Sequence, residues 1–124
     1  MENKWKNKSF IQSLKNAISG IIEVIKNGRN IKIQIIFAVI VSIFAIVFKI
    51  SNIEILILVL TIFLVLISEF MNTAVEMLAD LYTTEYNEKI KIIKDIAAGA
   101  VTLSAVASVI VGIIIFLPKL IELI

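Results

Sequence analysis

The chain has 124 residues and a formal net charge of +2, and 60% of its residues are hydrophobic. Soluble domains are usually about 45–50% apolar, so this composition excludes an ordinary soluble protein and predicts an all-α integral membrane protein. Cysteine and histidine are both missing from the sequence. Their absence excludes disulfides, thiolate chemistry and imidazole bases or metal ligands. Proton or metal chemistry must therefore use carboxylates, amides, hydroxyls and lysines.

The length predicts a single domain over residues 1–124. Residues 5–27 are predicted to form an amphipathic helix in the membrane interface, because apolar residues recur every three or four positions and lysines fill the other face. Trp5 near the start would anchor this basic helix at an anionic lipid surface. The alternative is a helix packed against the other helices. Asn27-Gly28 predicts a turn that ends it.

Three apolar stretches are candidates for membrane spans, at residues 31–48, 53–80 and 96–117. The charged residues 83–95 are expected to connect the last two spans, with Asp95 as the N-cap of the third span and Pro118 as its end. Small residues recur at intervals of four along the third span, at Ala100, Ser104, Ser108 and Gly112. Such a stripe predicts close helix packing. Because three helices give a small monomer little interior, we also expect an oligomer.

Lysine and arginine placement predicts the orientation. Seven of these residues lie before residue 33, at or ahead of the start of the first span, and three lie in the 83–95 connection, while the opposite side has only Lys49 and Lys119. The N-terminus and the connection are therefore predicted to be cytoplasmic, in a multi-pass protein of the cell membrane. Glu69 then lies about 24 Å along the second span from Ile53 at 1.5 Å per residue. In a hydrocarbon core about 30 Å thick, this position is close to the cytoplasmic boundary.

The second span ends in a polar stripe formed by Glu69, Asn72, Glu76 and Asp80. At 100° per residue these four side chains share a helix face about 80° wide. A charged group inside a membrane helix costs about 2.5–3.5 kcal/mol on insertion scales, so it usually faces a partner or a cavity. A hydrogen bond to a neighbouring helix also explains Glu69 taken alone, and solvation also explains Glu76 and Asp80.

Two chemical interpretations fit this stripe. Carboxylates at the interface bind Mg²⁺, which is often shared with nucleotide phosphates, and a deeper carboxylate can accept a proton from an alcohol. Together they suggest phosphoryl transfer from a cytoplasmic nucleotide to a membrane alcohol. The second interpretation is a carboxylate relay or gate in a small transporter. The sequence contains no Walker loop or kinase glycine-rich loop, and spacing alone does not separate the two.

At these residues the chain resembles the prokaryotic diacylglycerol kinase family, and in particular its Gram-positive undecaprenol kinase branch. The family pattern Glu-x-x-Asn-Thr-Ala-(Ile/Val)-Glu-x-x-x-Asp is complete over residues 69–80, and residues 94–101 match Lys-Asp-x-x-Ala-Gly-Ala-Val. Residues 13–21 and 112–120 are also similar to the corresponding parts of the branch. The likeness covers nearly the whole chain.

This resemblance implies a homotrimer, with active sites between subunits, that uses MgATP to phosphorylate undecaprenol. Diacylglycerol is the alternative lipid, and no nucleic-acid partner is expected. Glu69 would be the catalytic base and would bind the substrate together with Asn72, while Glu76 would bind Mg²⁺. The ATP-binding residues would be Asn16, Glu76, Asp80, Glu85, Tyr86, Asn87, Lys94 and Asp95. Without the resemblance, Lys94 is also explained as a juxtamembrane anchor.

The sequence departs from the family pattern after the first helix. The family usually has Glu-Arg-Asn-x-(Arg/Lys)-Ile-His there, and its glutamate is a second metal ligand. Here Gly28 replaces that glutamate and Gln34 replaces the histidine, while Asn87 replaces a second histidine in the later turn. Glu23 lies on a different helix face from position 28. The missing carboxylate predicts weaker Mg²⁺ binding, so a catalytically weakened or silent family member, or a small transporter, is a further alternative.

Overall fold

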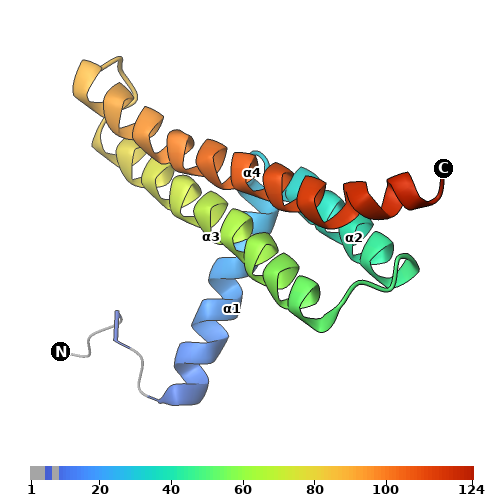
Figure 1. The fold of residues 1–124 in the computed structure, drawn as a ribbon. Helices are drawn as coiled ribbons and strands as arrows, with labels where there is room; N and C mark the ends of the chain where they lie inside the picture. The colour runs from blue at the N-terminus through green and yellow to red at the C-terminus, as the bar shows by residue number, and fades with distance from the viewer. Residues whose placement is uncertain (1–4, 7–8) are drawn as a thin grey trace.

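The computed structural model describes residues 5–6 and 9–124, and over these residues helices and turns account for the fold. The helices are α1 (Phe10–Asn27), α2 (Ile31–Val47), α3 (Asn52–Tyr82) and α4 (Glu88–Glu122) (Figure 1). Two of them, α3 and α4, are long and apolar enough to cross a membrane. These features confirm the predicted all-α membrane protein.

Helices α3 and α4 form a long hairpin that is the centre of the fold, and they run side by side over most of their length (Figure 1). Small side chains allow this approach. The hydroxyl oxygens of Ser68 and Ser104 lie 2.8 Å apart between the two helices, and Ser104 is buried. The predicted packing role of the small-residue stripe is therefore confirmed at Ser104.

Helix α2 packs along the hairpin near the end where α3 begins. A small apolar core forms there from Ile50, Leu58 and Ile115. Phe48 and Phe116 pack against this core, and the ring of Phe44 contacts both of their rings, with centroids 6.2–6.4 Å apart. With 17 residues, α2 extends about 25 Å at 1.5 Å per residue, which is slightly less than the hydrocarbon core of a bilayer. Membrane crossing by α2 therefore stays a prediction.

Helices α1 and α2 meet at a bend of 100°. Gly28 is the C-cap of α1 and Asn30 is the N-cap of α2, so the predicted turn after Asn27 is confirmed. The start of α1 differs from the prediction. The Ser9 hydroxyl accepts a hydrogen bond from the Gln12 amide at 3.2 Å, and this cap begins the helix at Phe10 rather than at residue 5. Trp5 and Lys6 lie in a turn, and residues 7–8 are outside the described part.

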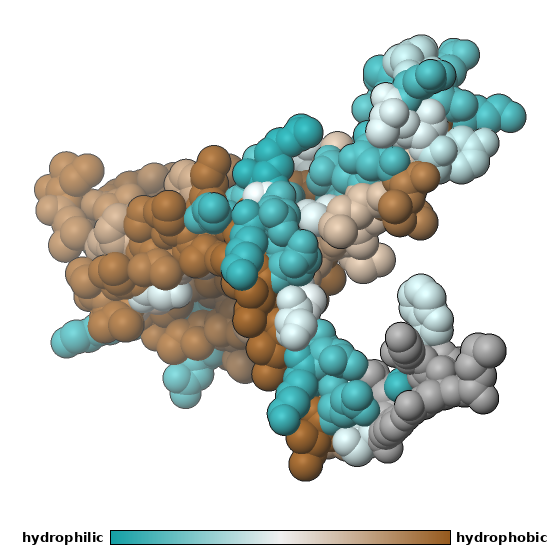
Figure 2. Space-filling model, turned by 180° about the vertical axis from the view of Figure 1, so that it is seen from behind, coloured by the Kyte–Doolittle hydropathy of each residue, from teal (hydrophilic) through white to brown (hydrophobic). Residues whose placement is uncertain are grey.

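The surface of the hairpin is mostly apolar, as Figure 2 shows, and polar side chains gather toward the end that carries the α3–α4 connection. Most large apolar residues of α2, α3 and α4 are exposed in the single chain. The apolar face of α1 is exposed as well, including Phe10 and Ile18. Exposed apolar surface of this extent requires lipid or other subunits to cover it.

The prediction that Asp95 caps the last helix is wrong. Helix α4 begins at Glu88, and the Asn87 carboxamide oxygen accepts hydrogen bonds from the amides of Lys89 and Ile90. Asn87 is a strong N-cap residue, and the residues that follow it are good helix formers, so the helix starts two turns earlier. The connection between α3 and α4 is therefore only residues 83–87.

The prediction that Pro118 ends this helix is also wrong, because α4 continues to Glu122. Proline removes one backbone donor, but neighbouring contacts hold the last turns. The Lys119 ammonium donates to the Ile115 carbonyl at 3.1 Å and pairs with the Glu54 carboxylate of α3 at 2.7 Å. Glu54 also completes a capping box with Ser51 at the start of α3.

Candidate active site

The polar stripe of α3 runs from the interior of the fold to its surface. Glu69 has no exposed surface and Asn72 is 6% exposed, whereas Glu76 is half-buried and Asp80 is exposed. All four lie on one continuous helix. This gradient agrees with a stripe that leaves the apolar layer toward an aqueous phase.

The buried Glu69 carboxylate is held by the N-terminal part of α2. Its Oε1 atom accepts a hydrogen bond from the backbone amide of Asn30 at 3.4 Å, and its Oε2 atom accepts one from Gln34 Nε2 at 3.3 Å. Asn30 is the N-cap of α2 and supplies no side-chain cap of its own. The carboxylate therefore lies at the positive end of the α2 dipole, where negative charge is favoured.

Asn72 and Glu76 form a second polar pair one turn further along α3. Asn72 Nδ2 donates to Glu76 Oε1 at 3.4 Å, and the buried Asn72 Oδ1 atom has no hydrogen-bond partner. A carboxylate beside an unpaired amide oxygen fits Mg²⁺, which binds through one or two carboxylates and completes its shell with water and phosphate oxygens. Over the described residues, no group of three acidic side chains surrounds a metal position.

Two ion pairs occupy the exposed end of the stripe. Lys94 Nζ of α4 lies 2.7 Å from Asp80 Oδ1 of α3, and Lys91 Nζ lies 2.6 Å from Asp95 Oδ2. The neighbouring Asp95 carboxylate raises the pKa of Lys91, which is therefore charged at physiological pH. The structure thus brings Asp80 and Lys94 together, and it places Asp95 on the same helix as Lys94.

The remaining predicted ATP-binding residues lie in two places. Glu85, Tyr86 and Asn87 form the exposed α3–α4 connection, where Asn87 also caps α4. Asn16 is exposed on α1, and α1 extends away from that connection (Figure 1). A single chain therefore keeps the two groups apart.

Gly28 occupies a tight position in the turn between α1 and α2. A Cβ atom added there would lie 2.6 Å from the Val24 carbonyl oxygen and 3.1 Å from Ile31 Cγ2. Any side chain at position 28 must therefore move the turn. Glu23 is the acidic residue nearest to position 28 in the sequence. Its carboxylate accepts a 2.6 Å hydrogen bond from Asn27 Nδ2 of the same helix.

Gln34 is a neighbour of Glu69 that the sequence interpretation left without a site role. One feature of the sequence could have indicated this contact: Gln34 is a carboxamide inside the otherwise apolar run of α2. Polar side chains within membrane helices usually form hydrogen bonds to another helix. The backbone amide of Asn30 carried no such signal, because every residue except proline has one.

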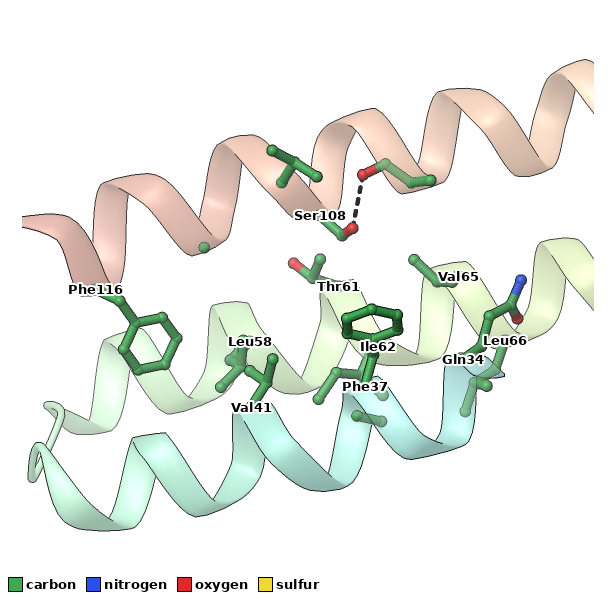
Figure 3. Close-up of a pocket in the computed structure, with 14 residues that line it drawn as sticks. Gln34, Phe37, Val41, Leu58, Thr61, Ile62, Val65, Leu66, Ser108 and Phe116 are labelled. Atoms are coloured by element: carbon green, nitrogen blue, oxygen red, sulfur yellow. Dashed lines mark hydrogen bonds between the residues drawn. The ribbon is translucent and has the colours of Figure 1, made fainter. Parts of the chain in front are cut away.

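An apolar cavity of about 440 Å³ lies between α2, α3 and α4. Figure 3 shows Gln34 at one end of it and Phe116 toward the other. Val41, Leu58 and Ile62 line the middle. The amide that contacts the buried carboxylate thus also borders an apolar space of the size of small-molecule sites.

Comparisons with known proteins agree with this arrangement. The profile of the family described as prokaryotic diacylglycerol kinase matches residues 15–116. The chain is 40% identical over 111 residues to an undecaprenol kinase of Bacillus subtilis, covering 90% of each protein. It is 38% identical over 124 residues to a diacylglycerol kinase of Synechocystis, covering 98% of this chain and 71% of that protein. No solved structure matches the chain significantly. The chain therefore belongs to the prokaryotic diacylglycerol kinase family, a family of lipid kinases.

Proposed function

We propose that this protein transfers the γ-phosphate of MgATP to the hydroxyl group of undecaprenol at the cytoplasmic face of the cell membrane. The observation that carries the proposal is Glu69, a carboxylate with no exposed surface at the deep end of a polar stripe that reaches Asp80 at the surface. A lipid alcohol arrives from the apolar side and a nucleotide from the aqueous side. The stripe connects these two environments.

In this reaction Glu69 removes the proton from the lipid hydroxyl. The hydroxyl oxygen then forms a bond to the γ-phosphorus, and the bond between that phosphorus and the β–γ bridging oxygen breaks, so that its electrons leave with ADP. Glu69 afterwards releases the proton to water. Positioning and charge neutralisation supply most of the catalysis in phosphoryl transfer.

Glu76 and the unpaired Oδ1 atom of Asn72 are the groups that would hold Mg²⁺. The ion would neutralise phosphate charge when bound there. Because a neighbouring chain or the nucleotide must supply the other ligands, this site is weaker than one with two protein carboxylates. Gly28, which lacks a side chain, accounts for part of that weakness.

Lys94 and Asp95 would bind the nucleotide together with residues of the α3–α4 connection. The Lys94 ammonium would exchange its exposed pairing with Asp80 for a phosphate oxygen, since exposed ion pairs are weak. Asn16 would reach the site from another subunit, because α1 extends away from the connection in its own chain. This arrangement supports the proposal of a homotrimer with shared sites.

Three further proposals accompany the function. The N-terminus lies in the cytoplasm, which the excess of lysine and arginine before residue 33 and in residues 83–95 supports. Helix α1 lies in the membrane interface, which its apolar face and its lysines support. Helix α2 is the third crossing helix.

The choice of undecaprenol over diacylglycerol is supported by the Bacillus relative, which the chain matches over 90% of that protein's length. The Synechocystis relative, at 38% identity, supports the alternative of diacylglycerol.

A direct competition between the two lipids distinguishes these two substrate proposals. Purified protein in mixed micelles receives equal amounts of both lipids and radiolabelled MgATP, and the products are separated by chromatography. We expect labelled undecaprenyl phosphate to predominate; a predominance of labelled phosphatidic acid would support the alternative.

The absence of a side chain at Gly28 favours one further candidate, a catalytically silent family member or a small transporter. Nucleotide binding distinguishes it from an active kinase. MgATP should raise the melting temperature of an active kinase in detergent, and the rise should disappear when EDTA is added. If MgATP does not change the melting temperature and no phosphate is transferred, the result would favour the silent family member or transporter.

A further inference from the structure

The starting point of this inference is the pair of hydrogen bonds that fix the Glu69 carboxylate. Both oxygens accept from α2, one from the Asn30 backbone at 3.4 Å and one from the Gln34 side chain at 3.3 Å. The backbone donor belongs to the fold and is present whatever the side chain at position 30. Gln34 is therefore the side chain whose identity decides how the carboxylate is oriented.

Gln34 also differs from the other polar residues that border the cavity. Thr61 donates its hydroxyl proton to the Ile57 carbonyl at 2.7 Å, and Ser108 donates to the Ala105 carbonyl at 2.7 Å, so both are satisfied within their own helices. Gln34 instead reaches across from α2 to α3. Its Oε1 atom is buried and has no hydrogen-bond partner.

An unpaired buried amide oxygen is costly unless another molecule supplies the donor. Gln34 Oε1 has this property at the end of the cavity (Figure 3), and the Nε2 atom of the same amide donates to Glu69, a residue that does not line the cavity. The amide thus borders the apolar cavity and also contacts Glu69.

We propose that Gln34 is a positioning residue that holds Glu69 in the orientation needed to take the proton of the lipid hydroxyl. The inference rests on the proposed function of Glu69 as the base. Gln34 does not exchange a proton itself, because a carboxamide is neutral and does not titrate. It acts through geometry, since misplacement of a catalytic group by about 1 Å costs up to about a hundredfold in rate.

The experiment compares four proteins in detergent. Gln34→Met keeps the length of the side chain and removes the N–H donor, while Gln34→His restores a donor through an imidazole N–H. Thr61→Val is the matched control, because it removes a polar group from the same cavity without touching Glu69. Circular dichroism and size-exclusion chromatography confirm that each variant folds as the wild type does.

The first readout does not depend on catalysis. An apolar carbodiimide modifies carboxyl groups inside a membrane protein, and mass spectrometry of peptides measures its incorporation at Glu69. We expect Gln34→Met to raise the labelling rate at Glu69 about threefold, because the released side chain moves more freely toward the reagent. Gln34→His and Thr61→Val should label at the wild-type rate. Equal labelling in wild type and Gln34→Met would overturn the proposal.

The second readout is steady-state transfer to the lipid alcohol. Gln34→Met should lower kcat about tenfold, the order expected for one hydrogen bond to a charged group, and leave KM for MgATP unchanged. Gln34→His should recover most of kcat. A kcat that stays at the wild-type value in Gln34→Met would overturn the positioning role and leave the kinase proposal standing. A labelling change in a protein that transfers no phosphate to any lipid alcohol would instead refute the kinase proposal and support the contact.

Discussion

The Lys94 ammonium of α4 lies 2.7 Å from the Asp80 carboxylate of α3, and this ion pair joins the two long helices just before their connection. Asp80 is the last member of the polar stripe, and its side chain is 61% exposed. The pair therefore costs little to open. A lysine held loosely at this place is available to a phosphate group.

Removing this lysine should affect nucleotide binding more than folding. We predict that Lys94→Met raises KM for MgATP about tenfold, because a charge-assisted hydrogen bond to phosphate is lost, and that it hardly changes the melting temperature. Lys89→Met is the matched control, since Lys89 is an exposed lysine of the same helix that has no proposed role in the site. Steady-state kinetics at varied MgATP measures the effect. An equal rise of KM in both variants would show that general charge, and not the position of Lys94, attracts the nucleotide.

The tight turn at Gly28 leads to a prediction that needs two variants. A Cβ atom there approaches the Val24 carbonyl at 2.6 Å, so both Gly28→Ala and Gly28→Glu should lower the melting temperature. The glutamate alone adds a carboxylate for Mg²⁺. We predict that Gly28→Glu reaches half-maximal rate at a Mg²⁺ concentration several-fold lower than Gly28→Ala does.

The comparison between these two variants removes the steric effect that they share. Magnesium titrations of the transfer rate, with free Mg²⁺ fixed by a buffer, provide the measurement. If both variants need the same Mg²⁺ concentration, then the missing carboxylate at position 28 does not limit metal binding.

A structural ion pair lies at the opposite end of the hairpin. Lys119 and Glu54 are 2.7 Å apart, and only about a quarter of each side chain is exposed. We predict that Lys119→Met lowers the melting temperature by a few degrees without changing KM for MgATP, because the pair joins α3 to α4 far from the polar stripe. Lys119→Arg should keep the pair and the wild-type melting temperature. A changed KM with an unchanged melting temperature would contradict this assignment.

Ser68 and Ser104 contact each other between α3 and α4, with their hydroxyl oxygens 2.8 Å apart. Ser104→Ala should cost about 0.5–1 kcal/mol, as one hydrogen bond between membrane helices does. Ser104→Leu should destabilise the protein much more, since its side chain does not fit where the helices touch. Unfolding in detergent with a denaturant measures both variants. Equal stability of the two would mean that the hairpin does not need a small residue at position 104.

Local sequence patterns predicted much of this fold. The continuous helix that carries Glu69 and Asp80 is predicted because the apolar run before Glu69 passes into the polar stripe without an intervening glycine or proline. The turn at Gly28 follows from its Asn-Gly sequence. Both depend on residues that are close in the chain, and the structure agrees with both.

The errors came where tertiary contacts or a competing cap decided the outcome. Asn87 and Asp95 are both possible N-cap residues. Helix α4 begins after Asn87 because the residues between the two positions are good helix formers. Pro118 remains inside α4, where Lys119 is paired with Glu54, which is 65 positions away in the sequence. The contact of Gln34 with Glu69 likewise joins two helices, so no local pattern predicts its geometry.

The measurement that tests the central claim most directly is the transfer of labelled phosphate from MgATP to undecaprenol by wild-type protein and by Glu69→Gln. This variant keeps the size of the buried side chain and removes its ability to accept the proton. We predict clear transfer by the wild type and a loss of at least about a thousandfold in kcat by a folded Glu69→Gln protein that still binds MgATP. Transfer by Glu69→Gln at the wild-type rate would contradict the role of Glu69 as the base.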